Sequence, residues 1–135
     1  MKTLVEYITE SISPEVFVVL KPGFLDLAQT IIERFEQDGW KMKKTTTKQL
    51  LLQEAKRLYY VHKKEDFYKD LCEYMSSAQS RAFIFVKDGS KKPFEEVAAI
   101  KDEIREKYGE SEMRNVLHSS DNVKNMQKEM SVYFT

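Results

Sequence analysis

His118 has the surroundings best suited to chemistry in this 135-residue chain. Arg114, Asn115 and Ser120 lie close to it in the sequence and offer hydrogen-bond donors of the kind that bind phosphate. A neutral imidazole is a good nucleophile near pH 7 when a third group fixes its tautomer and orientation. The pattern favours a phosphate-accepting histidine, while a histidine that is merely hydrogen-bonded in a polar loop is the simpler alternative.

A phosphate-accepting histidine needs partners, and the chain offers candidates for each. Glu129 is a candidate to orient the imidazole, and Lys21 and Arg105 are candidate cations for the non-reacting phosphate oxygens. Phe67 and Leu71 are four residues apart, so on a helix they share one face and can form an apolar clamp for a base. Taken singly, a lysine such as Lys21 is more often a solvated strand end, and a pair such as Phe67 and Leu71 is more often part of a buried core.

The second histidine, His62, lies among Lys63, Lys64 and Glu65. This charged setting is typical of a solvated surface side chain. Cys72 is the only cysteine, which rules out an internal disulfide and a cysteine zinc cluster and fits a reducing, cytoplasmic location with a buried thiol.

The elements that must position these residues follow from apolar patterning. Continuous apolar runs predict buried strands at 16–20 and 82–86, and alternation predicts a half-exposed strand at 40–47. Helical spacing is found at 24–35, 48–61, 66–75 and 93–108, the last stopped by Gly109. Residues 110–122 are loop-like, and a short helix and a terminal strand at 132–134 close the chain, with Glu129 at the start of that strand. The pattern predicts an α+β sandwich with helices on one face of the sheet.

Composition sets further bounds. The 22 basic and 22 acidic residues cancel, so no global field draws the chain to nucleic acid or to an anionic bilayer. No apolar run is long enough for a membrane span, and residues 1–14 lack a signal-peptide core. We therefore predict a lead-in at 1–14 and a single domain at 15–135, with neither nucleic acid nor membrane as partner.

Several segments together resemble the nucleoside diphosphate kinase family. The run Arg114-Asn115-Val116-Leu117-His118-Ser119-Ser120-Asp121 is similar to the family's R-N-hydrophobic-hydrophobic-H-G-S-D active-site run. The segments at 17–22, 31–39 and 58–77 and the end of the chain at 128–134 are similar to the family's first strand, first helix, nucleotide clamp and C-terminal region.

This resemblance implies a ferredoxin-like sandwich with a four-stranded antiparallel sheet covered by helices. It implies a ping-pong reaction in which a histidine takes the γ-phosphate of ATP or another nucleoside triphosphate and gives it to a diphosphate, with Mg²⁺ held mainly by the nucleotide phosphates. Carried over to this chain, His118 would be phosphorylated and Glu129 would hold its ring. The remaining residues would bind the nucleotide: Lys21, Tyr59, Phe67, Leu71, Arg105, Arg114 and Asn115.

The chain also departs from the family pattern. Ser119 replaces the glycine after the histidine, and the segment between Asp88 and His118 is shortened. Either residues 104–109 replace the family's arginine-containing loop, which is the alignment we favour because it needs no gap, or Arg105 and Ser111 stand for an earlier helix arginine and a loop threonine. The favoured alignment leaves one phosphate-binding arginine and one threonine of the family without a counterpart, and Lys91, Lys92 and Arg114 are candidate substitutes.

Three functions follow from these observations. The first is a working kinase, the second is a nucleotide-binding module with weak or no turnover, and the third is a nucleic-acid-binding ferredoxin-like domain. The zero net charge and the lack of a recognisable aromatic stacking pair on a strand count against the third. A homo-oligomer is expected, with a dimer favoured over a hexamer because the shortened segment is the one that forms the family's three-fold contacts.

Overall fold

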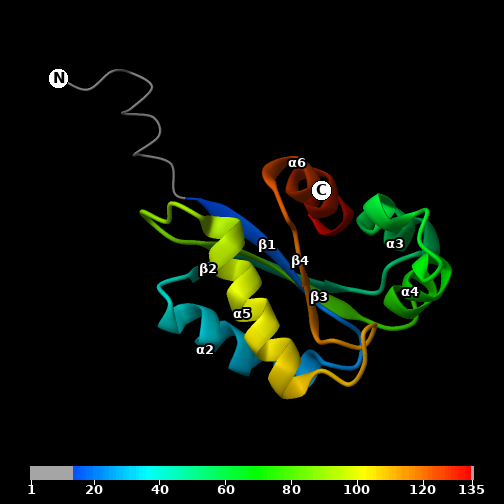
Figure 1. Ribbon diagram of the computed structural model, residues 1–135, viewed down its shortest axis with the longest axis horizontal. Coiled ribbons are helices and arrows are strands. Elements are labelled where there is room, and N and C mark those ends of the chain that lie inside the picture. Colours follow the sequence, from blue (N-terminus) through cyan, green and yellow to red (C-terminus); the bar gives the residue numbers. More distant parts are fainter. Residues whose placement is uncertain (1–13, 135) are drawn as a thin grey trace.

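The computed structural model describes residues 14–134, which form a four-stranded antiparallel sheet flanked by helices (Figure 1). The strand order is β2-β3-β1-β4. The strands are β1 (Glu15–Leu20), β2 (Lys41–Lys48), β3 (Ser80–Val86) and β4 (Leu117–Ser119). The predicted α+β fold with a four-stranded antiparallel sheet is confirmed. The predicted lead-in at 1–14 lies almost wholly outside the described residues.

Helices cover both faces of the sheet, not one as predicted. On one face lie the 3₁₀ turn η1 (Leu25–Leu27), α2 (Ala28–Gln37) and α5 (Pro93–Tyr108). On the other lie α3 (Leu52–Leu58), η2 (Tyr60–His62), α4 (Tyr68–Met75) and α6 (Val123–Tyr133). The separation of α2 and α5 from α3, α4 and α6 is visible in Figure 1. None of the helices within residues 14–134 is long and apolar enough to cross a bilayer.

Two apolar cores explain this arrangement. Side chains alternate across β1, so Val16 and Val18 pack with α2 and α5, while Phe17 and Val19 pack with α3, α4 and α6. Both sets are essentially fully buried. A strand that is apolar on every residue needs cover on both sides, and this requirement places helices above and below it.

The C-terminal region differs from its prediction. Residues 132–134 were expected to form a strand, but the helix α6 continues to Tyr133. Asn122 caps the helix by accepting a hydrogen bond from the backbone N–H of Asn125 at 2.9 Å. Met126, Val132 and Tyr133 then face the second core, and the hydroxyls of Tyr133 and Ser80 lie 2.6 Å apart. The short apolar run at 132–134 is therefore the buried end of a helix.

The loop expected at 110–122 contains a short strand. Residues Leu117–Ser119 form β4, which pairs with β1 in antiparallel register. Three residues are too few to show a period of two, so the pairing depends on the free edge of β1 rather than on local pattern. The predicted end of α5 at Gly109 is confirmed, and a Cβ added there would lie 2.5 Å from the carbonyl oxygen of Arg105.

Candidate functional site

His118 lies on β4, opposite Val19 of β1, at the outer edge of the sheet. Because no described strand follows β4, α5 on one face and α3, η2 and α4 on the other can all approach the same edge. Beyond it is a cavity of about 700 Å³ that His118 lines. The side chain of His118 is 16% exposed, so its ring is open to the cavity but largely withdrawn from solvent.

The imidazole of His118 is held by Glu129. Nε2 of His118 and Oε1 of Glu129 form a short hydrogen bond, and the carboxylate is buried on α6. A carboxylate can only accept a hydrogen bond, so Nε2 carries the proton and Nδ1 keeps its lone pair. Glu129 therefore fixes the tautomer that leaves Nδ1 unprotonated.

The electrostatics keep this imidazole neutral. Burial is the largest influence and lowers the pKa of His118 below its usual value of 6.5, with further lowering by the positive charges of Lys21 and Lys101. The hydrogen bond and negative charge of Glu129 act in the opposite direction. The ring is consequently uncharged at neutral pH, as a nucleophile must be.

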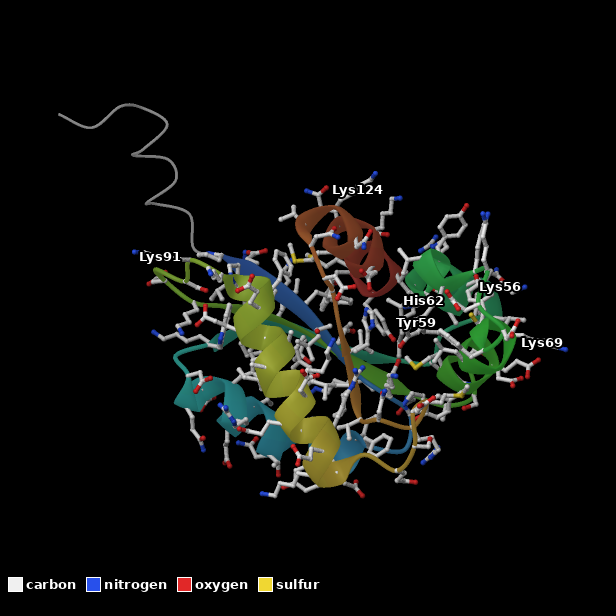
Figure 2. The ribbon with its side chains drawn as sticks, viewed as in Figure 1. Lys56, Tyr59, His62, Lys69, Lys91 and Lys124 are labelled. Atoms are coloured by element: carbon white, nitrogen blue, oxygen red, sulfur yellow. The ribbon has the colours of Figure 1, made fainter. Side chains whose placement is uncertain are left out.

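Most of the predicted site residues line this one cavity. Those that do are Lys21, Tyr59, Phe67, Leu71, Arg105, Asn115 and His118. Glu129 does not line the cavity and is hydrogen-bonded to the ring of His118, which does. Figure 2 shows Tyr59 and His62 together on the part of the molecule that joins α3 to α4, next to β4 and α6.

Lys21 is a buried cation with neutral partners. Its side chain follows the end of β1, is 3% exposed, and donates to Oδ1 of Asn115 at 2.7 Å and to the carbonyl oxygen of Met113 at 3.3 Å. Burial and the nearby Arg105 and Lys101 lower the pKa of Lys21 to about 7. An anion in the cavity would stabilise the charged form that burial disfavours.

Arg105 reaches the cavity from the last turn of α5. One of its terminal nitrogens donates to the carbonyl oxygen of Leu117 at 2.8 Å, which ties the helix to β4. Its Nε is buried and has no hydrogen-bond partner among the described residues, and the same holds for the hydroxyl of Tyr59. Unpartnered buried polar atoms beside a cavity indicate that a polar ligand belongs there.

The position of Arg105 also separates the two alignments. Residues 104–108 lie within α5, so they do not replace a loop as the favoured alignment required. Arg105 is a helix arginine, and Ser111 lines the cavity where the second alignment expects the loop threonine. The structure therefore favours the second alignment, because α5 continues unbroken to Tyr108.

Two aromatic side chains and a histidine form the wall opposite α5. The rings of Tyr59 and His118 are 5.1 Å apart in an edge-to-face arrangement, and those of His62 and Phe67 are 5.5 Å apart. Phe67 is 45% exposed, which is unusual for a phenylalanine and leaves its ring available to a flat ligand. His62, expected to be a solvated surface residue, is half-buried and lines the cavity.

Arg114 lies elsewhere. Its guanidinium lies between the rings of Phe24 and Tyr74, with centroid distances of 5.5 and 5.3 Å, and its Nε donates to Glu110 at 3.2 Å. It does not line the cavity. Its contacts instead brace the turn that leads into Asn115.

The backbone next to His118 is strained. Val116 has a φ of +79°, a conformation that costs a β-branched residue about 1–2 kcal/mol. Its side chain is fully buried, and its carbonyl oxygen accepts a hydrogen bond from the backbone N–H of Lys21 at 2.9 Å. Burial and this bond fix the conformation that places Lys21, Asn115 and His118 around one space.

Other residues that line the cavity were not among the predicted nucleotide-binding residues, although Ser111 has a place in the second alignment and Ser119 and Asp121 belong to the run around His118. The remaining ones are His62, Lys101, Glu112 and Met113. Lys101 precedes Arg105 by one helical turn, so helical spacing from Arg105 is the signal that would have found it. Lys91 and Lys92, the candidate substitutes for a missing arginine, do not line the cavity, and Figure 2 shows Lys91 at the far end of α5.

Fold and site together define an α+β domain in which a neutral, carboxylate-held histidine faces a cavity lined by cations and aromatic rings. Residues 15–135 match the family described as nucleoside diphosphate kinase. The chain belongs to the nucleoside diphosphate kinase family.

Individual proteins of known name are similar to this chain. The chain is 32% identical over 128 residues to a nucleoside diphosphate kinase of Hyperthermus butylicus, covering 88% of this chain and 90% of the relative. It is 30% identical over 127 residues to one of Kosmotoga olearia, covering 87% and 86%. A crystal structure of the Aquifex aeolicus nucleoside diphosphate kinase has a similar fold, with a TM-score of 0.81 at 24% identity over 92% of this chain and 96% of that one.

Proposed function

We propose that residues 15–135 form a working nucleoside diphosphate kinase, which transfers the γ-phosphate of ATP or another nucleoside triphosphate to a nucleoside diphosphate. The observation that supports this most is the hydrogen bond between Nε2 of His118 and the buried carboxylate of Glu129. It leaves Nδ1 unprotonated on a ring that lines a cavity with three cationic side chains, Lys21, Lys101 and Arg105.

The reaction consists of two half-reactions. Nδ1 of His118 attacks the γ-phosphorus, an N–P bond forms, the bond to the bridging oxygen breaks, and the nucleoside diphosphate leaves with that electron pair. A terminal phosphate oxygen of a second diphosphate then attacks the phosphohistidine, and the N–P bond breaks. Throughout, Nε2–H stays with Glu129, whose negative charge stabilises the positive charge that develops on the ring.

The remaining cavity residues bind the nucleotide. Arg105 and Lys21 neutralise phosphate charge, with Asn115 holding the ammonium of Lys21 in place. The hydroxyl of Tyr59, which has no partner among the described residues, donates a hydrogen bond to the nucleotide next to His118. Phe67 stacks on the base and Leu71 packs beside it, which gives broad base tolerance because every base has a π-face.

Mg²⁺ would be held mainly by the nucleotide phosphates. Within residues 14–134 no group of three or more His, Cys, Asp or Glu side chains is placed to hold a metal ion. The cavity does offer the carboxylates of Glu112 and Asp121, and oxygen is the ligand type that Mg²⁺ prefers. Phosphate oxygens would supply most of its ligands, and the bound ion would neutralise charge on the β- and γ-phosphates.

Assembly and location complete the proposal. We place the protein in the cytoplasm, where Cys72, a buried free thiol, stays reduced. We propose a homo-oligomer, with a dimer favoured, and β2 is a candidate contact because it is the other edge strand of the described sheet. Lysines along β2 disfavour non-specific pairing of this edge strand with other chains. A dimer through this edge must therefore place carboxylates against them.

The decisive experiment is transfer of label to the protein. Incubation with γ-labelled ATP and Mg²⁺ is expected to give acid-labile, alkali-stable label on the wild type and none on the His118→Ala variant. His62→Ala removes the other histidine and should still take up label, at a lower rate because His62 also lines the cavity. If the folded wild type takes up no label, the kinase proposal is wrong.

The second candidate is a nucleotide-binding module with weak or no turnover. It is favoured by the departures from the family pattern, which leave a phosphate-binding arginine without a counterpart, and by Arg105, which uses one of its donors on the carbonyl oxygen of Leu117. It predicts that ADP raises the melting temperature, as a ligand of the folded state must, while no phosphate is transferred. Label on His118 that passes on to a diphosphate would exclude it.

A further inference from the structure

Lys101 is a cation in the cavity to which the sequence resemblance gives no role. It lies on α5 one turn before Arg105, and both side chains line the cavity with Lys21 and His118. Residues four apart on a helix share a face, so the two positive groups approach the cavity together. Lys101 is half-buried and makes no hydrogen bond or ion pair with any residue in 14–134.

The positive charges near Lys101 are only partly balanced by the protein, since Lys21, Lys101 and Arg105 line the cavity with two carboxylates, those of Glu112 and Asp121. Burial and the positive charge of Arg105 lower the pKa of Lys101. The nearest opposing charges come from Asp121, Asp102 and Glu129, and Glu129 is already bonded to His118. Lys21 and Arg105 also have only neutral hydrogen-bond partners in the described residues, namely an amide oxygen and backbone carbonyls.

Three cations without carboxylate partners around one cavity repel each other in the free protein. The repulsion is relieved when a ligand with several negative charges binds, since each ammonium or guanidinium then gains a charged acceptor. A diphosphate or triphosphate is such a ligand, whereas a nucleoside is not. The cavity is therefore more cationic than Lys21 and Arg105 alone would make it.

We propose that Lys101 is a phosphate-binding residue, the second cation that α5 supplies to the cavity beside Arg105. This inference deepens the proposed function, since it rests on a nucleotide diphosphate or triphosphate occupying the cavity. It does not rest on turnover. Lys91 and Lys92 cannot take this role, because Lys92 pairs with Glu95 and neither residue lines the cavity.

The test compares binding of ADP and of adenosine by calorimetry, in the wild type and three variants. Lys101→Met should weaken ADP binding about tenfold, the size expected for one charge-assisted contact, and leave adenosine binding unchanged. Lys101→Arg should restore ADP affinity to near the wild-type value. Lys124→Met, an exposed lysine on α6 that Figure 2 shows pointing away from the molecule, should behave as the wild type.

The outcomes separate this inference from the proposed function. If Lys101→Met and Lys124→Met bind ADP equally well, or if Lys101→Met weakens adenosine as much as ADP, the role of Lys101 is overturned. If ADP binding by the wild type depends on Lys101 but the protein takes up no phosphate, the phosphate-binding role of Lys101 is supported and the kinase proposal is wrong. If the wild type does not bind ADP, both fall.

Discussion

Glu129 on α6 holds Nε2 of His118 on β4, so the proposed catalytic pair comes from a helix and a strand that are adjacent in the sequence. The carboxylate is buried and has no other hydrogen-bond partner among the described residues. Its charge and its position therefore both act on the imidazole, and the two effects can be separated by substitution.

Glu129→Gln should keep the ring in place but remove the charge. An amide oxygen still accepts from Nε2, while the positive charge that develops on the ring during attack loses its counter-charge. Labelling by γ-labelled ATP should slow by about tenfold, the difference between a charged and a neutral hydrogen bond. Because Glu129 raises the pKa of His118, the acid limb of the rate should also move to lower pH.

The control for this measurement is Glu95→Gln, an exposed glutamate at the start of α5. It should leave both the labelling rate and its pH dependence unchanged. A Glu129→Gln variant that labels as fast as the wild type would show that the carboxylate charge does not assist the histidine.

The buried ammonium of Lys21 should make stability depend on pH. Its pKa is about 7 in the folded protein against an ordinary 10.5, so between these values the unfolded chain binds more protons. Stability of the free protein should therefore rise with pH across this window, by at most about 1.4 kcal/mol per pH unit. Below pH 7 both states are protonated, and this contribution to the slope disappears.

Lys21→Met should flatten that rise, and urea denaturation at pH 7, 8 and 9 measures it. The matched control is Lys44→Met on the exposed strand β2, which should keep the wild-type slope. The same slope in Lys21→Met and the wild type would mean that Lys21 titrates as a solvated lysine.

The backbone conformation of Val116 predicts that a glycine variant is more stable than an alanine variant, the reverse of the usual order. Val116→Ala and Val116→Gly both lose buried methyl groups, but only glycine adopts a φ of +79° without strain. The glycine variant should therefore be the more stable of the two by about 1 kcal/mol, measured by denaturant titration. At an ordinary extended position glycine would be the less stable, so an alanine variant that is the more stable would show that the site is unstrained.

Phe67 should contribute to binding and little to folding. Its ring is 45% exposed, so Phe67→Ala should lower stability only slightly, while loss of stacking should weaken ADP and GDP alike by about 1–3 kcal/mol. Tyr60→Ala, at a residue that is 55% exposed and does not line the cavity, is the control and should bind both normally. A loss confined to one base would point to recognition of the base edge instead.

The residues of the candidate site could largely be predicted from the sequence, because short, local signals carry them. The run from Arg114 to Asp121 predicted the histidine, and the apolar run of β1 ending at Lys21 predicted a buried strand with a cation at its end. Apolar spacing also predicted the helices α2 and α5, since a stripe every three or four residues depends only on the local chain.

What only the tertiary structure decided depends on contacts between distant parts of the chain. The three residues of β4 are a strand because β1 has a free edge, and the run at 132–134 is helical because Tyr133 finds Ser80 and the second core. Lys101 reaches the cavity because α5 continues unbroken past it to Tyr108, and Arg114 turns away because the rings of Phe24 and Tyr74 hold it. The sequence by itself thus determined which histidine could react, and the fold determined which charges face it, because burial and Coulomb interactions act through space rather than along the chain.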